Sequence, residues 1–160
     1  YGMRPDIQLI TASKALGAEG AAVATSAPVA ELLRQQARSF VFSTSPAPAT
    51  CAAITAAVEI LERDPGPVRR LHANIARWHA NRGTAVGPTA GTGPIVPVHV
   101  GEESAAMEAA AQLSARGFIV PAIRWPTVPR GEAILRVTLM ATHTPGQIDA
   151  LCEELACLGI

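Results

Sequence analysis

The chain has 160 residues, a formal net charge of zero and 16% charged residues, so it lacks a basic surface suited to nucleic acid. Hydrophobic residues make up 49%, but no apolar run reaches the roughly 18 residues of a membrane-spanning helix, so we expect a soluble protein with no membrane segment. The three cysteines match neither zinc sites nor secreted disulfide frameworks, which favours a reducing cytoplasm.

The amino-terminal part is predicted to form a strand pair followed by helices. Residues 7–11 and 21–24 are apolar runs on either side of two glycines, which predicts two short strands and a turn. Ser26 is expected to cap a helix that begins near Pro28 and fades by residue 39. Residues 43–48 read as a loop, and a second helix is expected from about Thr50 to Arg63. The first of these helices should carry Val29, Leu32 and Leu33 on its buried face, and the second carries Ile54, Ala57, Val58 and Leu61 at helical spacing.

The carboxyl-terminal part is predicted to combine helices with a small sheet. Residues 64–67 contain two prolines and a glycine, so we expect a sharp break and a domain transition there. A helix with Val68, Leu71, Ile75 and Trp78 on one face should follow, and then a loop over residues 83–93.

Two strands and two helices are expected in the rest of the chain. A strand over residues 95–100 should lie at a sheet edge, because Pro97 lacks an N–H donor. Residues 104–116 read as a helix ended by Gly117, and residues 118–122 should be extended. Residues 134–140 alternate as in a half-buried strand, which leaves Arg136 on the face away from the core. The last helix should begin with a capping box of Thr144 and Gln147.

The segment of residues 11–17 carries the candidate chemistry. It contains Thr11, Ser13 and Lys14 at the exit of a predicted strand, where side chains and backbone N–H groups can face a ligand. The lysine amine can attack an aldehyde to form an imine, and the hydroxyls can donate to a phosphate. The alternative is an ordinary surface lysine in a polar turn. Histidines His72, His79 and His99 are scattered without metal-ligand spacing, so no metal site is expected.

An ordered set of segments resembles the α-oxoamine synthases, which are pyridoxal-phosphate enzymes of fold type I. The matching segments are residues 5–6, 11–17, 20–22, 42–49, 117–118, 122–131, 135–138, 141–144 and 147–149. The resemblance covers essentially the whole chain. It implies an α/β fold, in which residues 1–64 end the large mixed-sheet domain that binds the cofactor and residues 65–160 form the small carboxyl-terminal α+β domain.

The resemblance also implies a role for seven residues. Lys14 matches the lysine that binds pyridoxal 5'-phosphate as an imine and moves protons, and Thr11 matches a phosphate-binding hydroxyl. Ser43 and Thr44 match a loop that reaches the cofactor phosphate of the neighbouring subunit in a homodimer. Arg136 matches the arginine that binds the amino-acid carboxylate. The residues that match the substrate-facing segment are Arg124 and Thr127.

Each role has a structural alternative. Arg136 could be a solvated strand arginine, Ser43 and Thr44 could form a turn, and Thr127 could shape a proline-rich loop. His143 is more consistent with a structural role than with a catalytic one, and we leave it out of the site.

The implied reaction condenses an amino acid with an acyl thioester and releases carbon dioxide. Residues 122–129 are most similar to the family members that use alanine and a pimeloyl thioester, and Trp125 departs from the residues usual at its position. The chain begins like the interior of a longer one and lacks the family's ring-stacking and ring-pairing residues. We therefore expect the isolated chain to have little turnover. The alternatives are another α-oxoamine synthase or a non-catalytic α/β scaffold domain.

Overall fold

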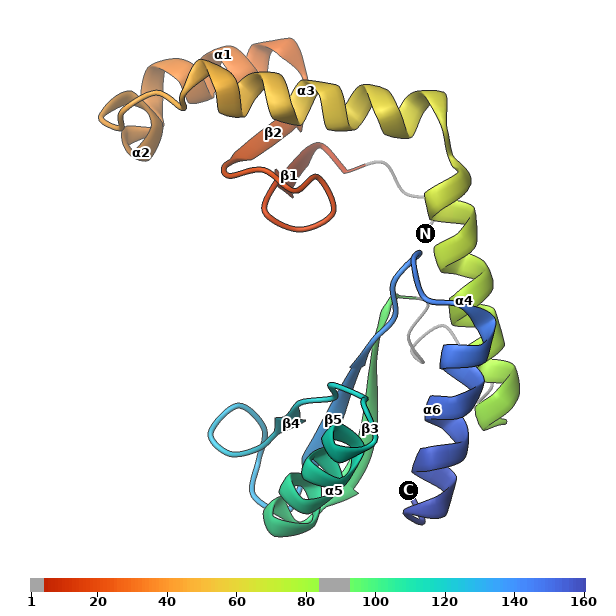
Figure 1. Ribbon diagram of the computed structural model, residues 1–160. Coiled ribbons are helices and arrows are strands. Elements are labelled where there is room, and N and C mark those ends of the chain that lie inside the picture. The colour runs from red at the N-terminus through yellow and green to blue at the C-terminus, as the bar shows by residue number, and fades with distance from the viewer. Residues whose placement is uncertain (1–4, 84–92) are drawn as a thin grey trace. The chain divides into compact units, whose positions relative to one another are not determined.

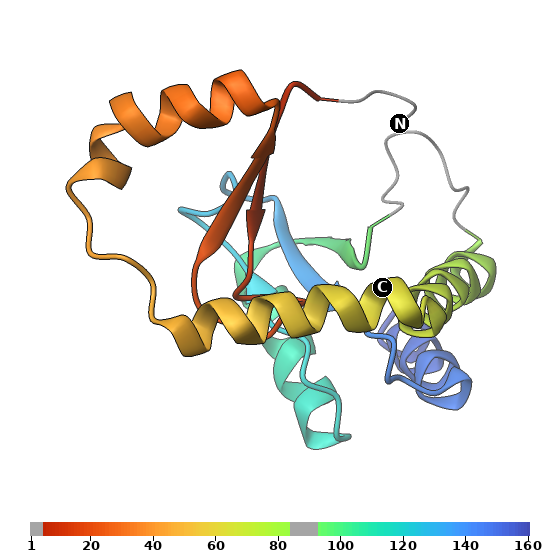
Figure 2. The ribbon, with the colours of Figure 1, turned by 90° about the horizontal axis from the view of Figure 1, so that it is seen from above.

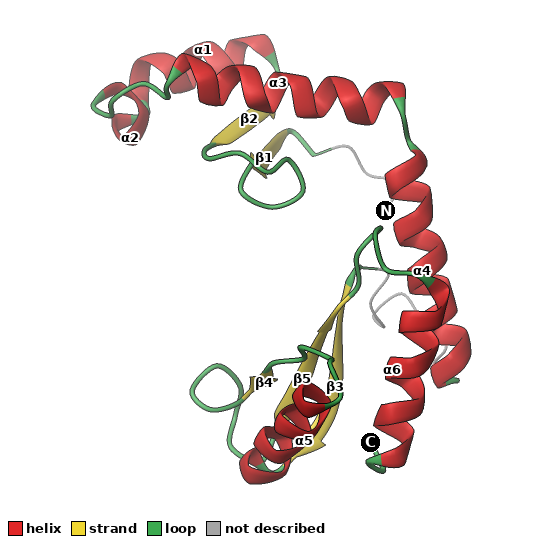
Figure 3. Cartoon of the chain, in the orientation of Figure 1, coloured by secondary structure: helices red, strands yellow, loops and turns green. Residues whose placement is uncertain are grey.

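The computed structural model describes residues 5–83 and 93–160 (Figure 1). The chain divides into two compact units, Tyr1–Asp64 (unit 1) and Pro65–Ile160 (unit 2). Both units contain helices and strands (Figure 3), which confirms the predicted α/β class. Among the described residues, no helix has the length and apolar character needed to cross a membrane.

Unit 1 consists of a hairpin and three helices. Strands β1 (Ile7–Thr11) and β2 (Ala21–Thr25) pair antiparallel, with Ile7 opposite Thr25 and Thr11 opposite Ala21, which confirms both predicted strands. The helices are α1 (Ala27–Gln36), α2 (Arg38–Val41) and α3 (Pro48–Arg63). Figure 2 shows the hairpin extending from the start of α1 to α3, and a Cβ atom added at Gly20 would lie 3.9 Å from Ile54 Cδ1.

Two helix starts in unit 1 differ from the prediction. Ser26 occupies the N-cap of α1, but its side chain makes no capping hydrogen bond, so the predicted side-chain cap is wrong. Helix α3 begins at Pro48 rather than near Thr50. A proline in the first turn of a helix loses no hydrogen bond, because the N–H groups there have no partner within the helix.

The predicted buried face of α1 and the apolar stripe of α3 are largely uncovered. Leu32 is 58% exposed, so its predicted burial is wrong, and Val58 and Leu61 on α3 are also exposed. Among the described residues of unit 1, only Ala12 is a buried hydrophobic residue. The apolar spacing on these helices is real, but the described part of unit 1 has no second layer that covers it.

Three helices frame unit 2, namely α4 (Gly66–Arg82), α5 (Glu103–Ala115) and α6 (Pro145–Cys157). The predicted break after Arg63 is shorter than expected, because Gly66 and Pro67 form the first turn of α4 and only Asp64 and Pro65 separate it from α3. Gly83 ends α4 in the left-handed conformation (φ +60°). Most of the loop predicted over residues 83–93 lies outside the described residues.

The sheet of unit 2 is antiparallel with the strand order β3-β5-β4. Its strands are β3 (Ile95–Gly101), β4 (Ala122–Ile123) and β5 (Ala133–Thr138). Pro97 lies on β3, an edge strand of this sheet, as its missing donor predicts. On β5, Leu135 and Val137 are buried while Arg136 and Thr138 are exposed, which confirms the predicted alternation.

The core of unit 2 lies between one face of this sheet and the three helices. Buried side chains from all three helices meet those of β3 and β5 in a single cluster. Figure 1 shows α4 and α6 side by side. The described helices therefore cover the face that carries Leu135 and Val137, and the face that carries Arg136 stays open.

Candidate cofactor and substrate site

Lys14 lies in a loop that is closed by backbone hydrogen bonds. Ala12 N donates to Gly20 O (2.9 Å), and Ala18 N donates to Ala12 O (3.0 Å). Gly17 N donates to Lys14 O (3.0 Å), and Gly17 has a φ of +62°, a value that glycine adopts without strain. These bonds fix the loop at the end of β1 and leave the Lys14 side chain exposed.

The Lys14 amine is close to one neighbouring hydroxyl. Its Nζ lies 3.4 Å from Ser13 Oγ, and Thr11 precedes the loop as the last residue of β1. Lys14 is also the single lysine of the 160-residue sequence, in which the other twelve residues of the Lys and Arg total are arginines. An exposed amine beside the Ser13 hydroxyl, on a loop that follows Thr11, offers the groups that bind an aldehyde and a phosphate.

Ser43 and Thr44 lie on the connection between α2 and α3. The Ser43 hydroxyl donates to Ser39 O, and Ser43 N donates to Phe40 O (3.3 Å). The Ser43 side chain therefore closes the end of α2, as the turn-forming alternative expects. Its predicted contact with a phosphate would require the hydroxyl to change partner.

Arg136 extends from the open face of the unit 2 sheet. It lies opposite Pro97 on β3, and its backbone N donates to Pro121 O (2.9 Å) on the other side. Both cross-strand neighbours are prolines, which offer no charge or hydrogen-bond donor to the guanidinium. The arrangement leaves an exposed planar cation that suits bidentate binding of a carboxylate.

Arg124 and Thr127 share one reverse turn. Thr127 N donates to Arg124 O (3.0 Å), and the Trp125–Pro126 peptide bond within the turn is cis. Both side chains are exposed. Of the seven predicted site residues, Arg124, Thr127 and Arg136 thus belong to unit 2, and the other four belong to unit 1.

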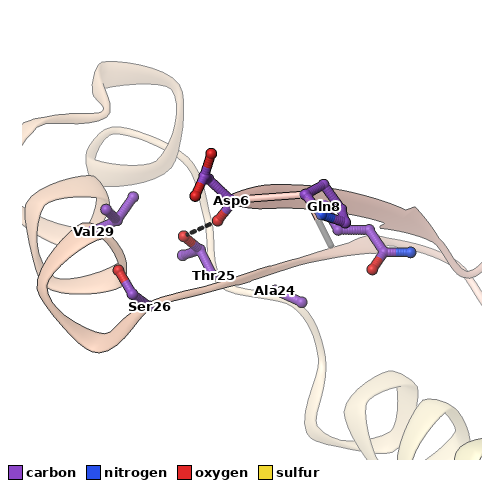
Figure 4. Close-up of a pocket in the computed structure, with 7 residues that line it drawn as sticks. Asp6, Gln8, Ala24, Thr25, Ser26 and Val29 are labelled. Atoms are coloured by element: carbon purple, nitrogen blue, oxygen red, sulfur yellow. Dashed lines mark hydrogen bonds between the residues drawn. The ribbon is translucent and has the colours of Figure 1, made fainter. Parts of the chain in front are cut away.

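A pocket of unit 1 contains none of the predicted site residues. It has a volume of about 630 Å³ and lies at the end of the hairpin opposite Lys14. Figure 4 shows Asp6, Thr25, Ser26 and Val29 around it, with Thr25 Oγ1 donating to Asp6 O (2.7 Å). No lysine, arginine or histidine lines this pocket, so the donor chemistry of the Lys14 loop is the better guide to the site.

One residue that was not predicted from the sequence shapes the start of α6. Asn74 is buried on α4, and its Nδ2 donates to Met140 O (2.9 Å) and His143 O (3.0 Å). A signal was present, because Asn74 is a polar residue within the apolar spacing of Leu71, Ile75 and Trp78. His143 Nδ1 accepts a hydrogen bond from Met140 N (3.2 Å), which is a local structural contact.

A second contact between α4 and α6 is electrostatic. Arg77 Nε donates to Asp149 Oδ1 (2.6 Å), Arg77 Nη2 pairs with Oδ2, and Asn81 Nδ2 also donates to Oδ1 (2.6 Å). These hydrogen bonds hold the pKa of Asp149 below its ordinary value. Among residues 5–83 and 93–160, no three His, Cys, Asp or Glu side chains gather as metal ligands would.

The chain belongs to the aminotransferase class I and II family, whose model matches residues 2–155. The match bears out both the resemblance drawn from the sequence and the fold expected from it. Pyridoxal phosphate is the cofactor of the enzymes to which this chain is related.

Two curated relatives have names from biotin synthesis. The chain is 50% identical over 157 residues to the biotin biosynthesis bifunctional protein BioWF of Corynebacterium kroppenstedtii, covering 96% of the chain and 22% of that protein. It is 44% identical over 157 residues to an 8-amino-7-oxononanoate synthase of Methylobacterium radiotolerans, covering 98% of the chain and 41% of that enzyme. The chain thus spans less than half the length of these relatives.

A solved structure supports the same family assignment. A serine palmitoyltransferase with pyridoxal phosphate as its internal aldimine superposes with a TM-score of 0.84 at 27% identity. The match covers 96% of this chain and 39% of that one. The fold is therefore that of part of a fold type I pyridoxal-phosphate transferase.

Proposed function

We propose that the complete gene product containing residues 1–160 is a pyridoxal-phosphate-dependent acyltransferase of biotin synthesis. It would condense L-alanine with pimeloyl-CoA or a pimeloyl carrier protein, lose carbon dioxide and give 8-amino-7-oxononanoate. The names of the two curated relatives support this choice of pathway and product. In the same proposal, residues 1–64 end the large domain, residues 65–160 form the small domain, and two subunits share their active sites.

The observation that carries the proposal is the identity and position of Lys14. A chain that uses arginine at every other basic Lys or Arg position has its one lysine in a closed loop after β1. An arginine guanidinium stays protonated and cannot serve as the amine nucleophile, whereas a lysine can. The position is thus chemically distinct from every other basic position in the sequence.

The remaining site residues would bind and orient the reactants. The Thr11 hydroxyl would donate to the cofactor phosphate, and Ser43 and Thr44 would reach the phosphate bound by the partner subunit. Arg136 would hold the amino-acid carboxylate through two parallel N–H donors. Bound pyridoxal phosphate supplies an electron sink for negative charge at the amino acid's α-carbon.

Lys14 and the substrate-facing turn complete the site. Lys14 would hold the cofactor through Nζ, then accept and return the α-proton as a base. Arg124 and Thr127 would contact the substrate. The unit 1 loop leaves the amine exposed, so desolvation must come from other parts of the complete protein.

Borohydride reduction of the complete gene product with pyridoxal phosphate tests the proposal. We expect the reduced cofactor on the peptide that contains Lys14, and we expect Lys14→Ala to abolish both this label and the visible absorbance of the cofactor adduct. Lys14→Arg keeps the charge and serves as the matched control, because it should fail equally. Labelling elsewhere, or no labelling, would contradict the proposal and favour a non-catalytic scaffold.

The isolated 160-residue chain should have little turnover with alanine and pimeloyl-CoA. The described residues of unit 1 leave the Lys14 side chain exposed. Normal activity of the isolated chain would contradict this expectation. A cytoplasmic location belongs to the same proposal, in line with three free thiols at Cys51, Cys152 and Cys157.

A further inference from the structure

The loop between β4 and β5 consists of two successive reverse turns. The first is closed by Thr127 N and Arg124 O (3.0 Å), and the second by Glu132 N and Pro129 O (3.2 Å). Gly131 has a φ of +76°, which fits the third position of the second turn. Trp125 and Arg130 therefore each occupy the second position of a turn.

These two residues contact each other at the surface. Arg130 Cζ lies 4.7 Å from the centre of the Trp125 ring, within the range of a cation–π contact. Trp125 is 50% exposed, in contrast to Trp78, which is 1% exposed in the core of unit 2. The contact therefore holds a large apolar surface and a cation together in solvent, where neither contributes to the core.

Arg130 keeps its charge available for a ligand. Among the described residues it forms no ion pair with a carboxylate, whereas Arg77 pairs with Asp149 and Arg116 with Glu154. The nearest acid in sequence, Glu132, lies 3.7 Å from His99 Nε2 instead. A guanidinium over an indole face keeps its N–H donors at the edge, where they can bind a carboxylate in a bidentate manner.

We propose that Trp125 and Arg130 together recognise an acyl group that ends in a carboxylate. This inference rests on the proposed function, in which the acyl donor is a pimeloyl thioester. The methylenes of that acyl group would lie on the indole, and its distal carboxylate would accept hydrogen bonds from Arg130. The pair then determines specificity, because an acyl group of equal length that ends in a methyl leaves Arg130 without a partner.

Kinetics with two matched thioesters test the inference in the complete gene product. Pimeloyl-CoA and heptanoyl-CoA have the same number of acyl carbons and differ in the terminal carboxylate. In Arg130→Gln we expect kcat/KM for pimeloyl-CoA to fall about 10- to 100-fold, as for loss of a hydrogen bond to a charged group. The value for heptanoyl-CoA should change less than about threefold, so the preference between the two thioesters collapses.

A second variant separates the roles of the two side chains. Trp125→Ala should weaken the binding of both thioesters, because the methylenes are common to them. Trp125→Phe should retain most of the affinity. The Kd values of both thioesters, measured by calorimetry, give a readout that does not depend on turnover. Arg69→Gln is the control, because Arg69 is an exposed arginine of α4 in the same unit.

Two negative results would contradict two different proposals. If the unmodified protein turns over neither thioester, the proposed function is wrong. If it converts pimeloyl-CoA and Arg130→Gln keeps the full preference in both kcat/KM and Kd, the recognition role of this pair is wrong. An equal loss for both thioesters in Arg130→Gln would also overturn it, because a charge-specific contact cannot act on a methyl group.

Discussion

The chemical properties of single side chains in this chain depend on whether they are exposed or buried. Lys14 is displayed by a loop that its own backbone bonds hold, so its chemistry depends on exposure. Asn74 and Cys152 are buried, so their properties depend on what surrounds them. The polar side chain of Asn74 is satisfied by two carbonyls, while burial raises the pKa of the Cys152 thiol.

Replacement of Asn74 should destabilise unit 2. Asn74→Ala leaves Met140 O and His143 O without their donor, so we expect the free energy of unfolding to fall by about 2 kcal/mol. Urea unfolding followed by circular dichroism measures this change. Arg70→Ala on the same helix is the control, since Arg70 is exposed, and an equal loss in both variants would contradict the assignment.

The cysteines of α6 should differ in reactivity. Cys157 is exposed, whereas Cys152 is buried with a raised pKa, so at a given pH it has less of the reactive thiolate. We expect iodoacetamide at pH 8 to alkylate Cys157 at least about tenfold faster than Cys152. Peptide mass spectrometry of timed samples measures both rates. In urea the two rates should converge, and equal rates in the folded protein would count against the burial of Cys152.

At the scale of elements, α4 and α6 are joined by charge as well as by apolar packing. The Asp149 carboxylate accepts hydrogen bonds from Arg77 and Asn81, both on α4. Because these bonds favour the ionised carboxylate, the pKa of Asp149 is lower in the folded than in the unfolded chain. Its contribution to stability is therefore present above the unfolded pKa and disappears as the pH falls through the folded value.

Asp149→Asn should remove this pH dependence. We expect the variant to melt below the unmodified protein between about pH 5 and pH 8, with the difference shrinking below about pH 4, where the carboxylate becomes protonated. Thermal unfolding across this range provides the measurement. Glu153→Gln on the same helix is the control. A difference in melting temperature that grew toward low pH would contradict a stabilising role of the ionised Asp149 carboxylate.

The sequence predicted those elements whose signals are local. The alternation around Arg136 and the capping box of Thr144 and Gln147 were both confirmed, because each depends on residues only a few positions apart. The burial of Leu32 was wrong, because burial depends on what covers a face and not on its spacing. The sequence located Lys14 on its loop, but it did not reveal the contact between Trp125 and Arg130, which depends on how two successive turns orient these side chains.

The two units differ in how many buried hydrophobic residues they contain. Within residues 5–83 and 93–160, every buried hydrophobic residue except Ala12 belongs to unit 2. Unit 1 instead leaves large apolar side chains exposed on its helices and hairpin, among them Phe42 at 78%. A unit without an apolar core has little to offset the loss of chain entropy on folding.

Unit 2 should therefore fold without unit 1. A polypeptide of residues 65–160 is expected to unfold cooperatively in urea and to show the blue-shifted fluorescence of a buried Trp78. A polypeptide of residues 1–64 should show no cooperative transition. Circular dichroism and tryptophan emission of the separate polypeptides test both statements. A cooperative transition in residues 1–64 would contradict the difference in core.

The exposed β1–β2 hairpin has a consequence for the synthesis of this chain in the cell. Translation runs from the amino terminus, so the ribosome exposes the hairpin and Phe42 before any residue of unit 2 exists. Unpaired strand edges and uncovered aromatic rings attract chaperones and also seed aggregates. When the 160-residue chain is expressed by itself, its yield should accordingly depend on chaperone supply during translation more than on the stability of its folded unit 2.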